Sequence, residues 1–412
     1  MSEAGNGNRT FDGVICIGGE DWWYHNRGHF DFQIMRRLAR QWPVLFVNSL
    51  GVRMPSLTHD RHFAARIGRK LKSLSRGAVN VENRFWVFSP LMVPGATGQR
   101  LSDWALAPQI WLAARKAGIR RPLLWVHCPA GAPLRDRLAH EALFMQRTDR
   151  FEAFPEGDPA VLGRQIAQLK ATADVAVYAA PALMAEETVE VCRPLLVTHG
   201  VDLETFTAAG RSGGPAPADV APIKGPRIGF IGGIDAHTFD PPLFLDVARR
   251  MPDCNFVMIG GCSLPEGWCS LPNVHLLGRK PYAQVAGYMA AMDALIMPWN
   301  NSAWIKACNP IKLKEYLAVG RPVVTTPFDA LEGWHHLVRV AHDGESFAAA
   351  IRAGLSEPVP AAAAAARLEV ETWDAKADLV RGAIANLGLV FDDARDTHRS
   401  AQARPASAVQ GG

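Results

Sequence analysis

Short apolar segments alternate with helical segments along most of the chain, and one segment without apolar periodicity interrupts them near the middle. Residues 14–17 and 44–47 are apolar throughout, which is typical of strands buried in a parallel sheet. Residues 208–226 are rich in Gly, Pro and Ala, as expected of a linker. A second strand and helix series starts at Arg227. The pattern predicts an α/β fold with two doubly wound, Rossmann-like domains and an interdomain cleft.

The length of 412 residues also favours about two domains, because a single core rarely grows so large. We expect a disordered start, an N-terminal Rossmann-like domain, the linker, a C-terminal Rossmann-like domain, a closing helix and a disordered tail. In that order, their ranges are residues 1–10, 11–207, 208–226, 227–374, 375–390 and 391–412.

The composition is that of an ordinary globular protein, with 48% hydrophobic residues and a formal net charge of +4. This charge does not favour strong binding to nucleic acids. The start lacks the basic-then-apolar pattern of a signal peptide, and no run of about 18 apolar residues would span a membrane. Seven cysteines, an odd number, favour reduced thiols. We therefore expect a cytoplasmic location and no transmembrane helix.

The most informative motif begins at Asn309-Pro310, which opens a predicted helix that ends at Gly320. Free N–H groups at the start of a helix attract a diphosphate, and Lys312 adds a full positive charge there. Glu315 follows about one turn later and can accept hydrogen bonds from ribose hydroxyls. Lys314 is expected to point elsewhere, because residues two apart do not share a helix face. The alternative is an ordinary joint between a helix and a strand.

A glycine pair, Gly232 and Gly233, follows the predicted strand at residues 227–231. Glycines at this position let the backbone approach phosphate groups closely, although a tight turn would also require them. Residues 234–240, which come next, contain no Arg or Lys. The glycine pair is a candidate donor-binding element together with Asn309, Lys312 and Glu315.

Residues 315–324 read Glu-Tyr-Leu-Ala-Val-Gly-Arg-Pro-Val-Val, which resembles the C-terminal-domain signature of GT-B glycosyltransferases. Residues 199–206 and 227–233 also resemble segments of this fold, in the group 1 enzymes known as glycosyltransferase family 4. That family places a second glutamate eight residues before Glu315, where this chain has Ala307. Residues 311–315 look more like the corresponding helix of the xanthan-pathway glucuronosyltransferase.

The resemblance implies that Lys312 is the main diphosphate ligand and that Glu315 binds ribose or uridine. It implies a nucleotide-sugar donor, UDP-linked by expectation, and neither a metal nor another cofactor, since basic side chains and helix ends hold the diphosphate. The chain also lacks the Asp-x-Asp motif of metal-dependent enzymes. Because the two-glutamate motif is broken, the stereochemical outcome stays open.

Two residues of the N-terminal half are candidate catalytic groups. Asp149 matches an aspartate that relatives place at the cleft, and an inverting transfer needs a general base for the acceptor hydroxyl. Its alternative is a surface carboxylate paired with Arg147 or Arg150. His127 ends a predicted strand, where family 4 enzymes place a histidine that contacts the donor sugar. A structural histidine is the alternative there.

The first loop is dense in groups that bind sugars, because aromatic rings stack on sugar rings while carboxylates and amides bind hydroxyls. It follows the first predicted strand and is expected to line the acceptor side. The candidate acceptor-binding residues are Glu20, Asp21, Trp22 and Arg27. The alternative is a surface loop with buried aromatic residues.

Residues 60–76 combine apolar residues at helical spacing with six Arg or Lys residues and one Asp. A basic amphipathic helix of this kind is typical of a membrane-surface element, although it can also pack on its own domain. The candidate membrane contacts are Arg66, Arg69, Lys70 and Lys72.

We therefore expect a glycosyltransferase, hexosyl or glycuronosyl, that acts on a glycan or polyprenyl-linked acceptor in polysaccharide biosynthesis. Its partners would be a nucleotide sugar, this acceptor and an anionic membrane surface at the inner face of the plasma membrane, with no nucleic acid. The alternatives are a GT-B sugar-nucleotide epimerase or phosphorylase, and a non-catalytic nucleotide-sugar-binding protein. A phosphorylase would hold pyridoxal phosphate, and a binding protein would show no turnover.

Overall fold

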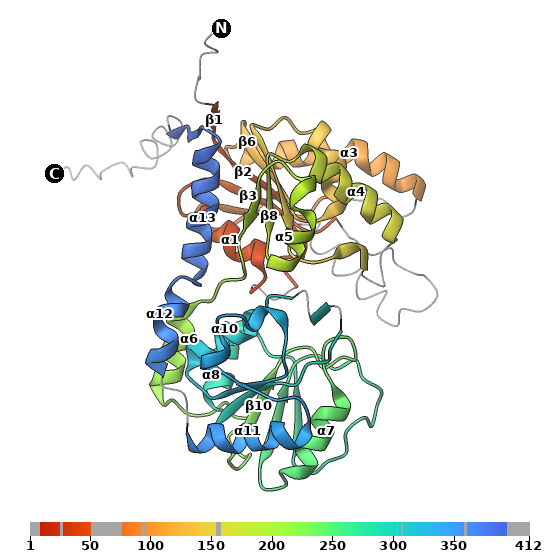
Figure 1. Cartoon of the computed structure of the whole chain (residues 1–412). Helices are drawn as coiled ribbons and strands as arrows, with labels where there is room; N and C mark the ends of the chain where they lie inside the picture. Colours follow the sequence, from red (N-terminus) through yellow and green to blue (C-terminus); the bar gives the residue numbers. More distant parts are fainter. Residues whose placement is uncertain are drawn as a thin grey trace, which may run out of the picture.

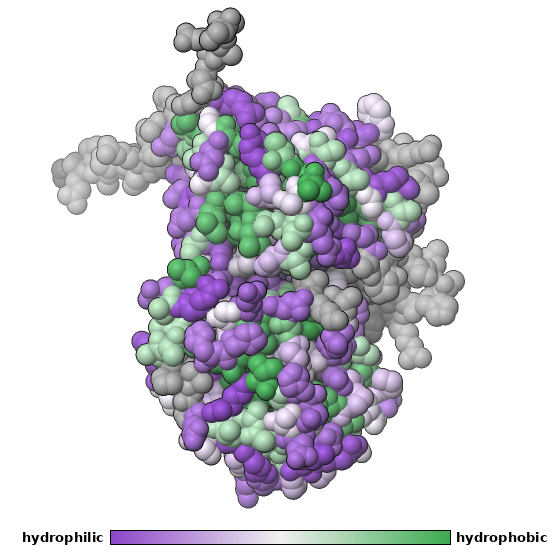
Figure 2. Space-filling view, viewed as in Figure 1, coloured by the Kyte–Doolittle hydropathy of each residue, from purple (hydrophilic) through white to green (hydrophobic). Residues whose placement is uncertain are grey.

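A computed structural model of the chain describes residues 9–24, 28–50, 76–91, 96–153, 158–302, 304–305, 308–357 and 361–393. These residues form two α/β domains, one above the other in Figure 1. On the face shown in Figure 2, hydrophilic residues cover most of both domains and apolar residues form small, separate areas. The fold class predicted from the alternating pattern is confirmed.

The N-terminal domain is built on an eight-stranded sheet in the order β4-β5-β3-β2-β6-β7-β8-β9. All neighbours are parallel except β4 and β5. The strands are β2 (Gly13–Ile17), β3 (Val44–Val47), β4 (Val79–Glu82), β5 (Phe85–Phe88), β6 (Pro122–Val126), β7 (Ala142–Arg147), β8 (Val175–Tyr178) and β9 (Pro194–Leu196). The central strands β2, β3, β6 and β7 are buried along their whole length, because helices cover both faces.

Helices cover this sheet on two sides. One face packs against α1 (Phe30–Leu38), and the other packs against α3 (Ala96–Lys116) and α4 (Pro159–Thr172). Helix α5 (Pro181–Glu187) follows β8. Asp158 caps α4 by accepting hydrogen bonds from the backbone N–H groups of Ala160 and Val161, and Pro159 fixes its first turn.

The C-terminal domain contains a six-stranded parallel sheet in the order β12-β11-β10-β13-β14-β15. Its strands are β10 (Arg227–Ile231), β11 (Asn255–Ile259), β12 (Val274–Gly278), β13 (Ala294–Met297), β14 (Val323–Thr325) and β15 (Arg339–Val340). Its helices are α6 (Leu203–Ser212), α7 (Pro241–Arg250), α8 (Tyr282–Ala290), α10 (Ile311–Val319), α11 (Gly344–Ser356) and α12 (Ala361–Glu369). Helices α7 and α11 cover one face, and α6, α8, α10 and α12 cover the other.

The end of the chain returns to the N-terminal domain. Helix α13 (Trp373–Asn386) packs along α1, as Figure 1 shows, and buries Trp373 in the N-terminal core. Strand β16 (Leu389–Phe391) then pairs in parallel with β1 (Arg9–Phe11). The two ends of the described chain therefore close one small sheet.

Two expectations about the irregular segments need correction. The first five residues of the expected linker, 208–212, belong to α6, which Asp202 caps and Gly213 ends in a left-handed conformation (φ 54°). The expected disorder does not extend to Arg9, Thr10 and Phe391, because these residues lie in the paired strands β1 and β16. The other residues of the two expected disordered ends lie almost entirely outside the described part.

Candidate functional site

The carboxyl ends of the two parallel sheets face each other across the domain boundary, where ligands of open α/β sheets bind. Helix α10 of the C-terminal domain reaches this boundary, since Ile311 packs against the N-terminal core. A cavity of about 540 Å³ lies between the domains and is lined by Thr198 on one side and by Cys308 and Asn309 on the other. The two domains therefore enclose a cleft.

The start of α10 is open toward a ligand. Pro310 precedes the first helical residue, and no side chain caps the helix. The first backbone N–H groups of an α-helix have no partner within the helix, so they attract an anion. At the other end, Gly320 ends the helix in a left-handed conformation (φ 75°), as the sequence predicts.

Lys312 lies directly over Gly232. A Cβ atom at Gly232 would be 2.4 Å from Lys312 Cε and 2.9 Å from Nζ, so the glycine makes room for the lysine. Within the described part of the chain, the Lys312 ammonium makes no hydrogen bond or ion pair. Burial lowers the pKa of Lys312, while the nearby Glu315, Cys308 and Asp235 raise it. The lysine is thus a partly desolvated cation in a position to bind an anion.

Glu315 is buried one turn further along α10, with 4% of its surface exposed. Its carboxylate accepts a hydrogen bond of 3.0 Å from the hydroxyl of Tyr282 at the start of α8. Burial raises the pKa of Glu315 to about 7, although Tyr282 and Lys312 both favour the charged form. A buried carboxylate with unused acceptor capacity suits hydroxyl groups of a ribose.

Lys314 points away from Lys312, which confirms the prediction from helix geometry. Its Nζ contacts Glu371 at 2.8 Å and also donates a hydrogen bond to the backbone oxygen of His199. Glu371 lies between α12 and α13 and also pairs with Lys376 at 2.7 Å and with Arg367 at 3.1 Å. This ionic cluster, Lys314, Glu371, Lys376 and Arg367, ties the donor-side helix to the returning end of the chain.

The loop after β10 contains no Arg or Lys, as the sequence shows. Asp235 closes it by accepting hydrogen bonds from the backbone N–H groups of His237 and Thr238 at 3.0 and 2.8 Å. A neighbouring cation comes from elsewhere, since Arg279 lies over Gly261, where a Cβ would be 2.5 Å from Arg279 Nε. Arg279 is exposed and follows β12. Sequence reasoning missed it because only the fold brings β11 and β12 together.

On the N-terminal side, three residues from separate elements form a hydrogen-bonded chain. Asp31 of α1 contacts Nδ1 of His127 at 3.0 Å, and Nε2 of His127 contacts the hydroxyl of Thr148 at 2.9 Å. Gly19 donates its backbone N–H to Asp31 at 2.9 Å and leaves room for the imidazole, because a Cβ there would lie 2.5 Å from the ring. Asp31 and Thr148 were not predicted, since no sequence spacing links them to His127.

Asp149 extends this chain toward the opposite domain. Burial raises the pKa of Asp149, while a hydrogen bond from Thr148 and the charge of His127 lower it. Asp149 also raises the pKa of Cys308 in the opposite domain, although burial is the larger cause there. The half-buried carboxylate of Asp149 therefore lies across the cleft from the start of α10.

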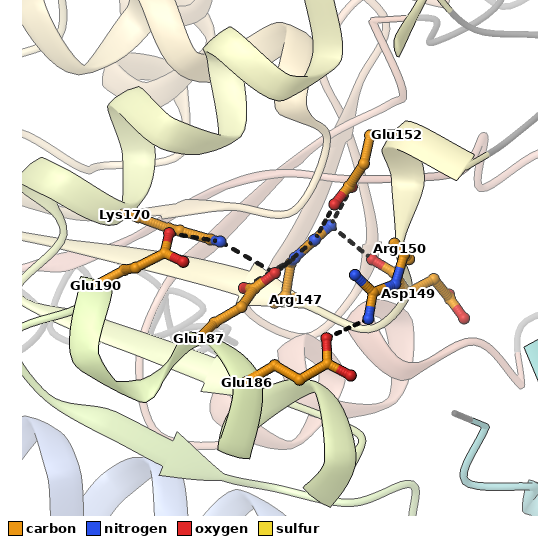
Figure 3. Close-up of polar contacts among 8 residues, drawn as sticks. All are labelled: Arg147, Asp149, Arg150, Glu152, Lys170, Glu186, Glu187 and Glu190. Atoms are coloured by element: carbon orange, nitrogen blue, oxygen red, sulfur yellow. Dashed lines mark hydrogen bonds and ion pairs between the residues drawn. The ribbon is translucent and has the colours of Figure 1, made fainter. Parts of the chain in front are cut away.

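The alternative pairing of Asp149 with the neighbouring arginines is wrong. Arg147 is fully buried and pairs with Glu152 at 2.7 Å and with Glu187 at 2.8 Å, as Figure 3 shows. At Asp149 it donates a hydrogen bond to the backbone oxygen, at 2.8 Å, and not to the carboxylate. Arg150 pairs with Glu186 instead. The arginines thus hold the loop in place, and no described residue forms an ion pair with the Asp149 carboxylate.

The first loop meets the expectation only in part. Glu20 and Asp21 are partly exposed near the carboxyl end of β2. The Trp22 ring is 1% exposed and packs against Phe32 and Phe85, so it offers no face to a sugar. We no longer assign Trp22 to acceptor binding.

Several expected residues lie outside the described part of the chain. They are Arg27 of the first loop and the basic residues Arg66, Arg69, Lys70 and Lys72. Among the described residues, no group of three or more His, Cys, Asp or Glu side chains could hold a metal ion. No described helix is both long and apolar enough to cross a bilayer.

Comparison with known proteins finds a family match within the C-terminal domain. Residues 225–357, which include Gly232, Lys312 and Glu315, match the family described as "Glycosyl transferases group 1". The C-terminal domain is therefore similar to the group 1 family. Over 135 residues the chain is also 34% identical to the putative teichuronic acid biosynthesis glycosyltransferase TuaH of Bacillus subtilis (strain 168). That match covers 32% of this chain and 33% of TuaH.

Solved structures extend the similarity to the whole chain at the level of the fold. Sucrose-phosphate synthase from Thermosynechococcus elongatus superposes with a TM-score of 0.65 and 15% identity, covering 91% of this chain and 99% of that one. HepE from Anabaena, in complex with UDP and glucose, superposes with a TM-score of 0.53 and 13% identity, covering 95% of this chain and 98% of HepE. The trehalose-6-phosphate synthase of Burkholderia multivorans superposes with a TM-score of 0.61 and 12% identity, covering 91% of this chain and 99% of the synthase. The chain therefore has the GT-B fold.

Proposed function

We propose that this protein is a glycosyltransferase that moves a sugar from a nucleotide diphosphate, UDP by preference, to a hydroxyl group of a glycan. The observation that carries the proposal is the position of Lys312, over Gly232 at the uncapped start of α10, with Glu315 one turn further on. This arrangement offers a cation and free N–H groups to a diphosphate, and a buried carboxylate to a ribose. The presence of UDP-glucose in the HepE structure supports the choice of nucleotide.

In the proposed reaction, the acceptor oxygen forms a bond to the anomeric carbon while the bond between that carbon and the diphosphate oxygen breaks. Lys312 and the N–H groups of α10 stabilise the negative charge that develops on the leaving diphosphate. Arg279 is the second cation that we assign to the donor. It is exposed beside Gly261, after β11, and has no ion-pair partner within the described part of the chain.

Asp149 is the proposed general base, and its neighbours give the proton a way out. The acceptor proton passes to the Asp149 carboxylate, from there to the Thr148 hydroxyl, and the Thr148 hydroxyl proton passes to Nε2 of His127. Asp31 holds Nδ1 at 3.0 Å and fixes the ring so that Nε2 faces Thr148 at 2.9 Å. His127 is therefore a positioning residue in this proposal rather than a direct ligand of the donor sugar.

For the acceptor, our proposal is the same as the expectation from the sequence. We propose a glycan or polyprenyl-linked glycan in polysaccharide biosynthesis, at the cytoplasmic face of the plasma membrane. The 34% identity over 135 residues to the putative teichuronic acid biosynthesis glycosyltransferase TuaH supports a polysaccharide acceptor. Glu20 and Asp21 are the described residues closest to this role, and we propose no metal or other cofactor.

A transfer assay with purified full-length protein tests the function. UDP release in the presence of UDP-sugars and membrane-extracted glycan acceptors is expected for the native protein. Asp149→Asn is expected to lower kcat by at least 100-fold, because general-base catalysis contributes roughly 10²–10⁴-fold, while UDP-sugar affinity stays unchanged. Thr148→Val is expected to lower kcat less and to change the pH dependence of kcat.

The control is Glu186→Gln, which removes an exposed carboxylate of the same domain whose one ion-pair partner among the described residues is Arg150. It should leave kcat unchanged. Normal turnover of Asp149→Asn would remove Asp149 as the base. Binding of UDP-sugars without turnover of any sugar and acceptor combination would favour the non-catalytic alternative.

A further inference from the structure

The outer side of α3 carries large apolar side chains that the rest of the described chain leaves exposed. Trp104 is 76% exposed and Leu112 is 75% exposed, while Leu106 and Ile110 on the inner side are buried in the core. Leu91 is 58% exposed and lies beside the helix, because Gln109 bonds to both its backbone N–H and its backbone oxygen. We call Leu91, Trp104 and Leu112 the α3 surface.

The fold does not require these residues. The inner side of α3 already supplies the apolar contacts to the sheet through residues such as Leu106, Ile110 and Ala114. A large exposed tryptophan is unfavourable in water, since burying such a side chain stabilises a protein by roughly 1.5–3 kcal/mol. An exposed cluster of this kind therefore indicates an interaction surface.

The charges around the α3 surface favour an anionic partner. Residues 96–121, which include α3, contain five Arg or Lys residues and one Asp. The guanidinium of Arg137 lies 5.5 Å from the centre of the exposed Trp104 ring. Arg121 is paired with Asp392, whereas Arg115, Lys116 and Arg120 are exposed. Basic groups beside an exposed aromatic ring match the border between lipid headgroups and acyl chains.

The position of the α3 surface is consistent with a bilayer partner. Helix α3 lies at the outer side of the N-terminal domain in Figure 1. Leu91 follows the carboxyl end of β5, at the same edge of the sheet that carries Gly19 and Asp149. A membrane that touches this surface would lie beside the opening of the cleft.

We propose that the α3 surface docks on an anionic lipid bilayer, with Trp104 and Leu112 in the interfacial region and Arg115 and Lys116 at the headgroups. This docking does not depend on the proposed reaction. It also differs from the expectation for the basic segment at residues 60–76, because it uses apolar side chains of a described helix. It gives the N-terminal domain a fixed orientation at the lipid surface.

Vesicle flotation with the full-length protein tests the proposal. The vesicles are either phosphatidylcholine alone or phosphatidylcholine with phosphatidylglycerol, so that neither contains a glycan acceptor. The native protein is expected to float with the anionic vesicles, and more weakly at high salt. The double variant Trp104→Ser, Leu112→Ser is expected to bind at least tenfold more weakly.

The matched control is Val189→Ser, because Val189 is 89% exposed but lies in the short helix Thr188–Glu190, away from α3. It should float like the native protein, and both variants should show native circular dichroism. Lys312→Ala should float normally even when it no longer binds UDP, which separates lipid docking from the proposed reaction. Equal flotation of the double variant, or no flotation of the native protein, would overturn the proposal. A dimer that the double variant dissociates would identify a second copy as the partner instead.

Discussion

At the scale of single residues, the donor side depends on a contact between a glycine and a lysine from distant parts of the chain. Gly232 leaves the space that Lys312 occupies, and any side chain at residue 232 would displace the lysine. The same relation holds on the opposite side of the cleft, where Gly19 leaves space for His127. Both sides of the cleft therefore position a functional side chain by close backbone approach.

We predict that Lys312→Met weakens UDP-sugar binding about 10- to 100-fold, because a hydrogen bond to a charged group contributes roughly 1.5–3 kcal/mol. Isothermal titration calorimetry measures this loss. Gly232→Ala should weaken binding in the same direction by moving Lys312. Lys224→Met, which removes an exposed lysine of the same domain, is the control and should bind normally. Equal affinity in all four proteins would exclude Lys312 as a diphosphate ligand.

The raised pKa of Glu315 predicts how the stability of the protein changes with pH. Its pKa of about 7 in the folded protein lies above the ordinary value of 4.5, because burial disfavours the charge. Between these two values the folded state holds more protons than the unfolded state, so Glu315 lowers the stability as the pH rises from 4.5 to 7. His199 acts in the opposite direction, because burial lowers its pKa from 6.5 to about 3.

Comparing the native protein with Glu315→Gln isolates the effect of Glu315 on stability, because His199 is present in both proteins. The variant should gain about 1–3 kcal/mol relative to the native protein between pH 5 and pH 8. Urea denaturation at the two pH values provides the measurement. A constant difference between the two proteins would show that the Glu315 carboxylate titrates normally.

At the scale of elements, α10 has two functions on two sides. Lys312 and Glu315 face the donor end of the cleft, while Lys314 enters the ionic cluster with Glu371 and Lys376. The cluster joins the donor-side helix to the segment between α12 and α13. Burial lowers the pKa of Lys314 to about 8, and the surrounding cations lower the pKa of Glu371 to about 2 against burial. The position of α10 thus depends on a buried carboxylate.

We predict that Glu371→Gln destabilises the protein by about 3 kcal/mol, because it leaves buried Lys314 and Lys376 without a counter-charge. The native contribution should be complete above pH 4.5, the ordinary value for glutamate, and should be lost as the pH falls toward 2. Urea denaturation at pH 7 and pH 3 checks both statements. Asp253→Asn, at an exposed pair with Arg352, serves as a control with little effect. A similar loss at pH 3 and pH 7 would contradict the assignment.

The local sequence pattern predicts helices and strands better than it predicts which residues lie side by side in the fold. The buried strands and the helix that starts at Ile311 were readable, because apolar runs and a Gly stop signal mark them. The second half of α6, residues 208–212, was read as part of the linker despite the Asp202 cap and Gly213, because its Ala and Gly content masked the periodicity. The partners Asp31, Thr148 and Arg279 were not readable, since each reaches the cleft only through the sheet order.

At the scale of the whole molecule, the end of the chain passes from the C-terminal domain back to the N-terminal domain and completes its core. Helix α13 follows the C-terminal domain in sequence, but it buries Trp373, Val380 and Ile384 in the core of the N-terminal domain. Strand β16 then pairs with β1. The N-terminal domain is therefore incomplete without residues 373–391.

We predict that a chain ending at residue 357 does not fold its N-terminal domain, because the core loses these apolar side chains. Trp373→Ala in the full chain should already cost about 3–5 kcal/mol. Calorimetry and limited proteolysis can follow each domain separately. A truncated chain with a native N-terminal domain would show that α13 only rests on its surface.

This return of the chain also sets an order for folding during synthesis. The C-terminal domain is continuous in sequence from α6 to α12 and can fold as soon as these elements leave the ribosome, whereas the earlier-made half must wait for its last helix and strand. For most of translation the first half of the protein would thus expose an unfinished core. Chaperones that bind nascent chains should therefore occupy this protein near its beginning rather than near its end.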